Sequence, residues 1–267
     1  MRRAALLFVA VLTTGCAHSA PAWSPKLDAA AHAIEPTPAD QVRELPLKGV
    51  RNGRDFAGIV GAHGKIPPDH FFRTATLEDT TEGDKKVLLA HGVKLDIDLR
   101  NGFEAARAPD ALEGDPRFRY VRISLFGSGI WDWLTKTRGD LYAAALSKHA
   151  EKFRQVFHEL ATQKEGAVVF HCAAGKDRTG LISAMLLSLA GADREAIVHN
   201  YALSAHYLYP TGDDHAAVER ALLSTPASAI EEFLNALTYQ YGGARVYLLG
   251  IGVSEADVDT LTKRLGQ

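Results

Sequence analysis

The sequence predicts an α/β fold in which a central, mostly parallel sheet is flanked by helices. Strand patterns alternate with helical patterns between residues 93 and 190, and this order is typical of parallel strands joined by crossover helices. The composition fits a folded domain with a sizeable core, because 46% of the 267 residues are hydrophobic and 23% are charged. Glycine and proline are scattered along the chain, which excludes collagen-like and disordered sequences.

The charge and the cysteine content of the chain exclude some classes of function. The chain has 30 Lys and Arg against 32 Asp and Glu, a formal net charge of −2, so we expect no nucleic-acid partner. Its two cysteines cannot make a disulfide-stapled scaffold. The histidines lack the spacing of metal ligands, so we expect neither a metal site nor another cofactor.

The first residues have the pattern of an export signal. A Met-Arg-Arg start precedes an apolar run, residues 4–12, that is far shorter than the roughly 20 residues needed to span a bilayer. We therefore interpret residues 1–15 as a signal peptide. Residues 16–42 contain several prolines among Ala and Ser and no regular period, which predicts a flexible tether, and residues 43–267 then form the folded domain.

The signal ends at a cysteine that is a candidate for lipidation. The Thr-Thr-Gly-Cys sequence ending at Cys16 resembles a bacterial lipobox, although Thr13 stands where that motif usually has Leu. Lipidation of Cys16 is the favoured interpretation, and ordinary cleavage near Ala20 or Ala22 is the alternative. In both cases we expect an exported protein, in the periplasm or at the cell surface, with membrane contact through the lipid anchor if one is attached.

Two strands are predicted in the first half of the folded domain. Residues 93–99 alternate strictly between apolar and polar, which predicts a half-buried strand with Asp96 and Asp98 on one face. Arg100 falls on the same face at the carboxyl end. Residues 118–125 are rich in aromatic and β-branched side chains and predict a second strand.

The second half contains a buried strand between two helices. Apolar residues follow the helical period over residues 141–163, a short apolar run predicts a strand at 167–170, and residues 179–190 form a helix that is apolar almost all round. Ligands of open α/β sheets bind beyond the carboxyl ends of the strands. The loop at residues 171–178 is therefore the predicted site.

This loop combines a nucleophile with groups that bind an oxyanion. Its sequence is HCAAGKDRTG over residues 171–180, with Cys172 and Arg178 six positions apart and small residues between them. Backbone N–H groups, the start of the following helix and a guanidinium all favour phosphate, and all favour a thiolate. Such surroundings lower a cysteine pKa from about 8.5 to roughly 3.5–7.5.

Two other interpretations of the loop fit less well. A buried, inert cysteine does not require Gly175 and Arg178 at this spacing. A nucleotide-binding P-loop needs an upstream Gly that is missing, and Asp177 stands where Ser or Thr should be.

The loop resembles the signature of the cysteine-dependent protein tyrosine phosphatases, in which Cys-x5-Arg lies between a buried strand and a buried helix. Other segments are similar to the bacterial secreted tyrosine phosphatase family, which includes mycobacterial and listerial enzymes. These segments are Asn52–Gly58, Phe72–Thr74, Asp98–Arg100 with Glu104, Lys176–Asp177 and Tyr247–Ile251. The resemblance covers about residues 43–265. Two positions depart from the family pattern, with Gly53 where the family has Phe and Thr74 where it has Ser.

The resemblance implies a protein-tyrosine-phosphatase-like fold and a two-step reaction without a cofactor. Cys172 attacks phosphorus, Arg178 holds the equatorial oxygens, and water later hydrolyses the phosphocysteine. Thr179 would hydrogen-bond the sulfur. His171 would help to set the pKa of the thiolate, or else is a spacer at the strand end. The phosphate-binding residues implied are Ala173, Ala174, Gly175, Lys176, Asp177 and Arg178.

The general acid has three candidates. Asp177 lies in the loop and is either the acid or a carboxylate that braces the loop. Asp132, between two tryptophans, is either an acid on a separate loop or a helix cap. Asp98 points to the correct end of its strand and is either an acid or the partner of Arg100 in an ion pair.

The expected substrate is phosphotyrosine, with phosphoserine or phosphothreonine as weaker substrates. A phosphoinositide or inositol phosphate is the alternative, because Lys176 adds charge for a head group with several phosphates. A catalytically dead phosphoresidue-binding module is a third hypothesis, against which the intact Cys172 and Arg178 argue. Residues 204–228 form either a cover over the site or a surface helical hairpin, and Arg73 either binds phosphate or braces the fold.

Overall fold

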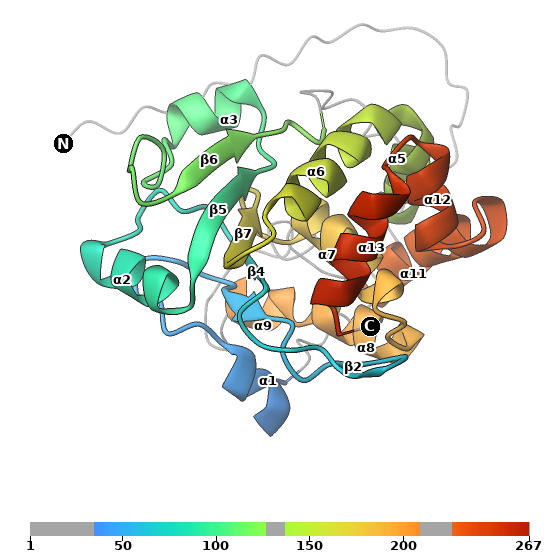
Figure 1. The fold of residues 1–267 in the computed structure, drawn as a ribbon, viewed down its shortest axis with the longest axis horizontal. Coiled ribbons are helices and arrows are strands. Elements are labelled where there is room, and N and C mark those ends of the chain that lie inside the picture. Colours follow the sequence, from blue (N-terminus) through green and yellow to red (C-terminus); the bar gives the residue numbers. More distant parts are fainter. Residues whose placement is uncertain (1–34, 127–136, 209–225, 267) are drawn as a thin grey trace, which may run out of the picture.

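A five-stranded sheet lies at the centre of the structure, a computed structural model that describes residues 35–126, 137–208 and 226–266 (Figure 1). The strand order is β1-β4-β7-β5-β6, and only β1 runs antiparallel to its neighbour. The strands of this sheet are β1 Arg54–Asp55, β4 Phe71–Thr74, β5 Val93–Asp98, β6 Arg119–Arg122 and β7 Ala167–His171. A separate hairpin is formed by β2 Val60–Gly61 and β3 Gly64–Lys65. The predicted α/β class and mostly parallel sheet are confirmed.

Helices surround the sheet (Figure 1). The helices before β7 are α1 Pro38–Arg43, α2 Glu82–Ala90, α3 Gly102–Arg107, α5 Arg138–Lys148 and α6 Ala150–Thr162. Those after β7 are α7 Asp177–Leu189, α8 Arg194–Ala202, α9 Ser204–Leu208, α11 Ala227–Asn235, the π-helix η1 Ala236–Gln240, α12 Ala244–Gly250 and α13 Glu255–Arg264. Several of the helices begin with a side-chain cap, such as the capping box of Thr81 and Asp84 at α2.

Two hydrophobic cores cover the two faces of the sheet. On β7, Val168 and Phe170 belong to the larger core, whereas Ala167 and Val169 belong to the smaller one, as expected from the alternation of side chains along a strand. The larger core is shared with α5, α6, α7 and α11 to α13, and the smaller one includes Leu88 of α2. The sheet is therefore covered on both sides, which parallel strands require.

Strand β5 matches the predicted segment, but it is not half-exposed. Asp96 and Asp98 share one face as predicted, yet both are completely buried. An alternating pattern looks the same whether its polar side chains meet water or meet other buried polar groups. Here they meet His171 and Arg100. The second predicted strand, 118–125, is shorter and corresponds to β6.

The helix predicted over 141–163 is wrong in one respect, because it is two helices. It is divided at His149, whose φ of −121° ends α5 and precedes α6. Neither Pro nor Gly marks this break, and the apolar period continues through it. The helix predicted from Thr179 begins two residues earlier, at Asp177, so the end of the predicted loop is the first turn of α7.

The described chain starts with a helix that contacts the folded domain. Residues 38–42, which were expected within the flexible tether, are part of α1, and Arg43 at the end of α1 donates from Nε to the carbonyl oxygen of Ala57 at 2.6 Å.

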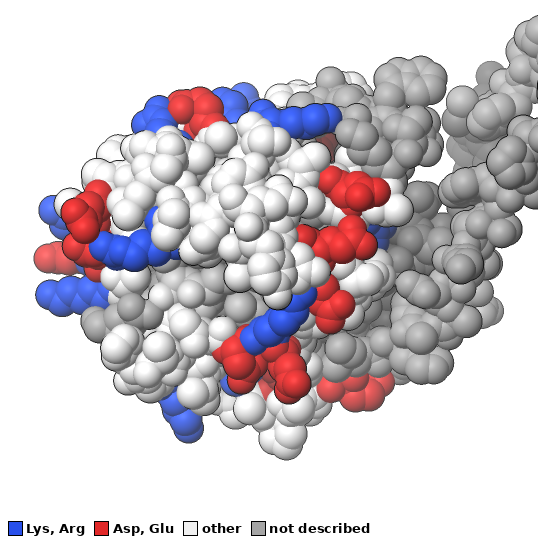
Figure 2. Space-filling view, turned by 90° about the vertical axis from the view of Figure 1, so that its right-hand side faces the viewer, with Lys and Arg blue, Asp and Glu red and all other residues white. Residues whose placement is uncertain are grey.

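No helix in the described ranges is long and apolar enough to cross a bilayer. On the face shown in Figure 2, the basic side chains of the described part lie among acidic ones.

Candidate active site

The predicted loop connects β7 to α7 at the carboxyl edge of the sheet. β7 ends at His171 and α7 begins at Asp177, so Cys172 lies in the short turn between them. The first N–H groups of a helix have no partner within the helix, and its N-terminus carries partial positive charge. The fold therefore brings Cys172, Asp177 and Arg178 together at an end that favours anions.

Asn52 and Arg73 fix the outer side of the loop. The side-chain Nδ2 of Asn52 donates to the carbonyl oxygens of Ala174 and Gly175, each at 3.0 Å. Asn52 is buried and has a φ of 58°, in the left-handed region that Asn tolerates better than most residues. Arg73 donates from Nη2 to the carbonyl oxygen of Gly175 at 2.7 Å. Arg73 is fully buried, so the geometry favours the bracing role.

The peptide groups of the loop consequently turn their N–H groups inward. The backbone N–H of Thr76 donates to the carbonyl oxygen of Ala173 at 3.0 Å, so three consecutive loop carbonyls bind partners outside the loop. In a trans peptide, the N–H points away from the C=O. The N–H groups of Ala174, Gly175 and Lys176 therefore face the inner side. Convergent N–H groups of this kind form a site for an anion.

Cys172 is nearly buried, with 2% of its surface exposed. Burial raises the pKa of its thiol, but the charge of Arg178 and the neighbouring Thr179 outweigh this effect, so the pKa is lowered from its ordinary value. The surroundings of the sulfur thus favour the thiolate, which is the nucleophilic form.

Arg178 is held by a bidentate ion pair with Glu104 of α3. The two Nη–Oε distances are both 2.6 Å. Glu104 also accepts from the backbone N–H of Asn101, whose side chain caps α3, so helix α3 fixes the carboxylate. This planar pairing sets the orientation of the guanidinium beside the loop. The motif containing Glu104 was recognised in the sequence, but its role in holding Arg178 was not predicted.

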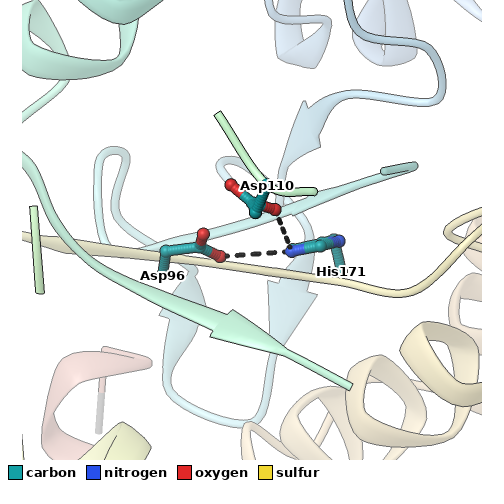
Figure 3. A group of neighbouring side chains, drawn as sticks. All are labelled: Asp96, Asp110 and His171. Atoms are coloured by element: carbon teal, nitrogen blue, oxygen red, sulfur yellow. Dashed lines mark ion pairs between the residues drawn. The ribbon is translucent and has the colours of Figure 1, made fainter. Parts of the chain in front are cut away.

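His171 precedes Cys172 and lies among three buried carboxylates. Figure 3 shows two of them, Asp96 and Asp110, beside the His171 ring. Its Nε2 is 3.1 Å from Asp110 Oδ2, 3.4 Å from Asp96 Oδ1 and 3.8 Å from Asp98 Oδ1, and its Nδ1 is 3.4 Å from the carbonyl oxygen of Cys172. Burial lowers the pKa of the ring, but these carboxylates outweigh burial and raise it to about 9. The surroundings of His171 therefore favour the protonated ring directly behind the nucleophile.

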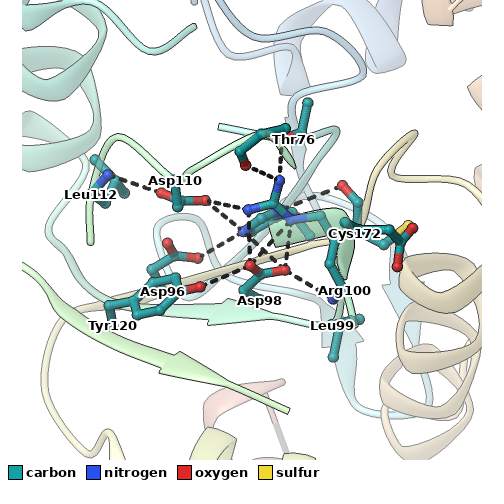
Figure 4. A network of polar contacts seen from close by, with 12 residues as sticks. Thr76, Asp96, Asp98, Leu99, Arg100, Asp110, Leu112, Tyr120 and Cys172 are labelled. Carbon is teal, nitrogen blue, oxygen red and sulfur yellow. Dashed lines mark hydrogen bonds and ion pairs between the residues drawn. The ribbon is translucent and has the colours of Figure 1, made fainter. Parts of the chain in front are cut away.

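Asp98 belongs to the same buried network (Figure 4). Its two oxygens accept from Nε and Nη2 of Arg100, with the shortest distances at 2.9 Å, and Oδ2 also accepts from the hydroxyl of Tyr120 at 2.8 Å. Burial raises the pKa of Asp98, but these donors and the charge of His171 lower it overall. The geometry favours the ion pair with Arg100 over the general-acid alternative.

Asp177 contacts three polar side chains. The hydroxyl of Tyr142 donates to its Oδ1, Arg138 Nε lies 3.6 Å from Oδ1, and Lys176 Nζ lies 3.7 Å from Oδ2. Burial raises the pKa of Asp177, but the charges of Lys176 and Arg138 and the bond from Tyr142 lower it overall. Lys176 is itself buried, with 3% exposed. Its ammonium group lies beside the Asp177 carboxylate.

One group among the described residues has donors that could hold a metal ion. Asp96, Asp110 and His171 each offer a buried ligand atom, and these atoms lie within 4.8 Å of one another. Protons explain this cluster as well as a metal ion does. Burial raises the pKa of Asp96 well above its ordinary value, so a protonated carboxyl group can lie beside the imidazole ring. This group could not be predicted from the sequence, because its members come from three separate segments.

Some predicted residues lie outside the described part of the chain. They are the lipidation candidate Cys16, the general-acid candidate Asp132 and most of the proposed cover at 204–228, of which α9 and residues 226–228 are described. Sequence reasoning also missed Tyr142 and Arg138, which reach Asp177 from α5. No local pattern marks them, because their role depends on how α5 lies against α7.

The chain was compared with known proteins. A model of the tyrosine phosphatase family matches residues 45–267. A tyrosine-protein phosphatase of Nostoc commune is 45% identical over 223 residues, which is 76% of this chain and 76% of that protein. The triple specificity protein phosphatase PtpB of Mycobacterium tuberculosis is 28% identical over 192 residues, which is 60% of this chain and 68% of that protein.

Among solved structures, P. aeruginosa TpbA in complex with pTyr aligns with a TM-score of 0.36 and 16% identity over 69% of this chain and 87% of that chain. The range matched by the family model covers most of the chain and includes the loop with Cys172 and Arg178. The chain therefore belongs to the tyrosine phosphatase family and is a protein tyrosine phosphatase.

Proposed function

We propose that this enzyme hydrolyses phosphotyrosine through a phosphocysteine intermediate. The thiolate of Cys172 attacks phosphorus, the phenolic oxygen leaves with a proton from Asp177, and water then cleaves the S–P bond to release phosphate. The observation that carries this proposal is the loop itself. Its carbonyls bind outside partners, its N–H groups turn inward, and a cysteine with a lowered pKa lies at its base.

The loop and Arg178 stabilise the charge that develops on the phosphoryl oxygens. The inward N–H groups of Ala174, Gly175 and Lys176 are fixed in advance by Asn52 and Arg73, so little reorganisation accompanies the reaction. Charge on the phosphoryl group spreads over three equatorial oxygens. A guanidinium already oriented by Glu104 can donate to two of them.

Asp177 supplies the proton to the leaving group in this proposal. In the empty site its neighbours favour the ionised form, as the lowered pKa indicates. A bound phosphate dianion adds negative charge beside the carboxylate and raises its pKa, so the proton is gained as substrate binds. Tyr142, which already contacts Asp177, orients the carboxyl group.

The second step requires the sulfur to leave as a thiolate. The groups that lower the pKa of Cys172, namely Arg178 and Thr179, stabilise that thiolate again when the S–P bond breaks. His171 adds a positive charge behind the same residue. The Asp177 carboxylate left after the first step accepts a proton from the attacking water.

The test is hydrolysis of p-nitrophenyl phosphate by the full chain. We expect Cys172→Ser to abolish turnover, Cys16→Ser to leave it unchanged, and chelators to have no effect. Mass spectrometry of acid-quenched enzyme should find phosphate on the peptide that contains Cys172. Turnover that survives Cys172→Ser, or that chelators remove, would reject the mechanism.

Phosphotyrosine is preferred over a phosphoinositide because of the position of Lys176. Its ammonium group is buried against Asp177, so it offers no second phosphate position to a head group. One relative is named a triple specificity phosphatase, and we propose phosphoserine and phosphothreonine as weaker substrates here. Comparing a phosphotyrosine peptide, its phosphoserine analogue and a short-chain phosphatidylinositol 3-phosphate tests this order. Faster turnover of the lipid would support the phosphoinositide alternative.

We also propose that the enzyme is exported and lipid-anchored through Cys16. The proposal rests on the signal-like residues 1–15 and the lipobox-like sequence that ends at Cys16. Expression in a bacterial host with labelled fatty acid should label the wild type but not Cys16→Ser, and should place the wild type in the membrane fraction. A mature N-terminus after Ala20 or Ala22 would instead show ordinary cleavage.

A further inference from the structure

Two buried arginines lie directly opposite each other behind the loop. Arg54 on β1 and Arg73 on β4 are cross-strand partners in the sheet, with 1% and 0% of their surfaces exposed. Like charges at directly opposite positions destabilise a sheet, and burying a charge is costly unless it is paired. This arrangement therefore requires a compensating interaction.

Neutral groups provide all the hydrogen bonds of the two guanidiniums in the described structure. Arg54 donates to the carbonyl oxygen of Asn200 at 2.7 Å and to the backbone and side-chain oxygens of Asn52. Arg73 donates to Asn200 Oδ1 at 2.6 Å and, more weakly, to Ser204 Oγ at 3.3 Å. Within the described ranges, neither forms an ion pair with a carboxylate. Burial lowers the pKa of each, and the charge of Arg54 lowers that of Arg73 further.

Two of the other arginines near the site differ in this respect. Arg100 is paired with Asp98, and Arg178 is paired with Glu104. Carboxylates therefore neutralise both of these arginines. In the described part of the chain, Arg54 and Arg73 have no such ion pair, although Tyr207, Asp40 and Glu44 favour the charged form of Arg54.

Both arginines are connected to the nucleophile loop. Arg73 donates directly to the carbonyl oxygen of Gly175, and Arg54 holds Asn52, which donates to the same oxygen. The negative charge of the Cys172 thiolate favours the charged form of Arg73. The thiolate inside the loop therefore compensates the charge of Arg73, whereas Asp40 and Glu44 contribute to compensating that of Arg54.

We propose that Arg54 and Arg73 form a cationic layer behind the loop whose charge is compensated in part by the anions that the loop holds, the Cys172 thiolate and the substrate phosphate. The inference rests on the proposed function of this loop. Both arginines are positioning residues, because they act through Gly175, through Asn52 and through their electric field. Buried charges are screened little by salt, so this contribution persists at physiological ionic strength.

Two substitutions of Arg73 separate charge from hydrogen bonding. Arg73→Gln keeps a hydrogen-bond donor but removes the charge, whereas Arg73→Lys keeps the charge but loses the planar fork. Two measurements do not depend on turnover. The first is the alkylation midpoint, the pH at which iodoacetate alkylates Cys172 at half its maximal rate. The second is the concentration of inorganic phosphate that halves the rate of this alkylation. Mass spectrometry of the Cys172 peptide measures both.

We expect Arg73→Gln to raise the alkylation midpoint by about one pH unit and the protecting phosphate concentration about tenfold, since one unit of pKa corresponds to a tenfold change in equilibrium. Arg73→Lys should stay within about threefold of the wild type in phosphate protection but lose kcat, because the loop is less well fixed. Arg54→Gln removes charge without removing a direct bond to the loop. It should raise the protecting phosphate concentration by about threefold or more and raise the alkylation midpoint by the corresponding amount.

Arg264→Gln is the matched control. Arg264 is also a buried arginine that donates to backbone carbonyls, including that of Gly166 at 2.6 Å, but those carbonyls do not belong to the loop. This variant should be less stable than the wild type, but its alkylation midpoint and its protecting phosphate concentration should be those of the wild type. Equal losses in Arg73→Lys and Arg73→Gln, or unchanged phosphate protection in Arg73→Gln and Arg54→Gln, would overturn the cationic layer. Failure of the proposed function is distinct, because it appears as turnover in Cys172→Ser.

Discussion

The empty site and the proposed reaction favour opposite protonation states of Asp177. Its contacts with Lys176, Arg138 and Tyr142 favour the carboxylate in the empty site, whereas a general acid must carry a proton. A phosphate dianion in the loop reconciles the two, because it changes the local charge only when substrate is bound. The dependence of the rate on the leaving group separates this role from simple bracing.

We predict that Asp177→Asn lowers kcat for a phosphotyrosine peptide by about 100-fold. The loss should be less than about tenfold for difluoromethylumbelliferyl phosphate, whose leaving group departs without a proton. Asp140→Asn, at the exposed start of α5, is the control and should leave both rates unchanged. Equal losses on both substrates would show that Asp177 only braces the loop.

At the scale of elements, the turn between β7 and α7 depends on one glycine. Gly175 has a φ of 65°, and a Cβ at this position would lie 2.2 Å from the carbonyl oxygen of Thr74 on β4. Gly175 is thus required both by the left-handed backbone and by the close approach of a neighbouring strand. Its position between Cys172 and Arg178 links the anion site directly to the sheet.

We predict that Gly175→Ala destabilises the protein by roughly 2 kcal/mol or more and removes most activity, because the loop carbonyls lose their outside partners. Urea unfolding and p-nitrophenyl phosphate turnover measure the two effects. Gly102→Ala is a matched control, since a Cβ at Gly102 meets nothing within 4 Å. A fully active Gly175→Ala would contradict the described loop.

The sequence predicts the elements around the loop well because their signals are local. The apolar run at 167–170 and the helical period after it need no distant partner to be read. The break at His149 was not predictable, because the apolar period is the same on both sides. Contacts between distant segments, such as Asn52 with Gly175 and Glu104 with Arg178, depend on topology, and the sequence offered only the motifs that contain these residues.

At the scale of the whole molecule, a buried charge cluster connects the sheet to the site. It contains Asp96, Asp98, Asp110, Arg100 and His171, from β5, the segments after it, and β7. Such clusters make stability depend on pH. The pKa of His171 is raised to about 9 in the folded protein, so the native state binds its proton more tightly than the unfolded state does.

We predict that the contribution of His171 to the free energy of unfolding is complete below about pH 6.5 and is lost as the pH rises through about 9, with a size of roughly 2–3 kcal/mol. Urea unfolding of the wild type and of His171→Gln at about pH 6 and pH 10 measures it. The difference in stability between the two proteins should shrink at the higher pH. A difference that does not change with pH would show that His171 is neutral in the native state.

The central claim is that Cys172 is a thiolate at neutral pH. The rate of its alkylation by iodoacetate as a function of pH, followed by mass spectrometry of its peptide, tests this most directly. We predict a midpoint below the ordinary value near 8.5, because the surroundings of Cys172 lower the pKa of its thiol. A midpoint at or above about 8.5, or a native protein in which Cys172 does not react, would contradict the account.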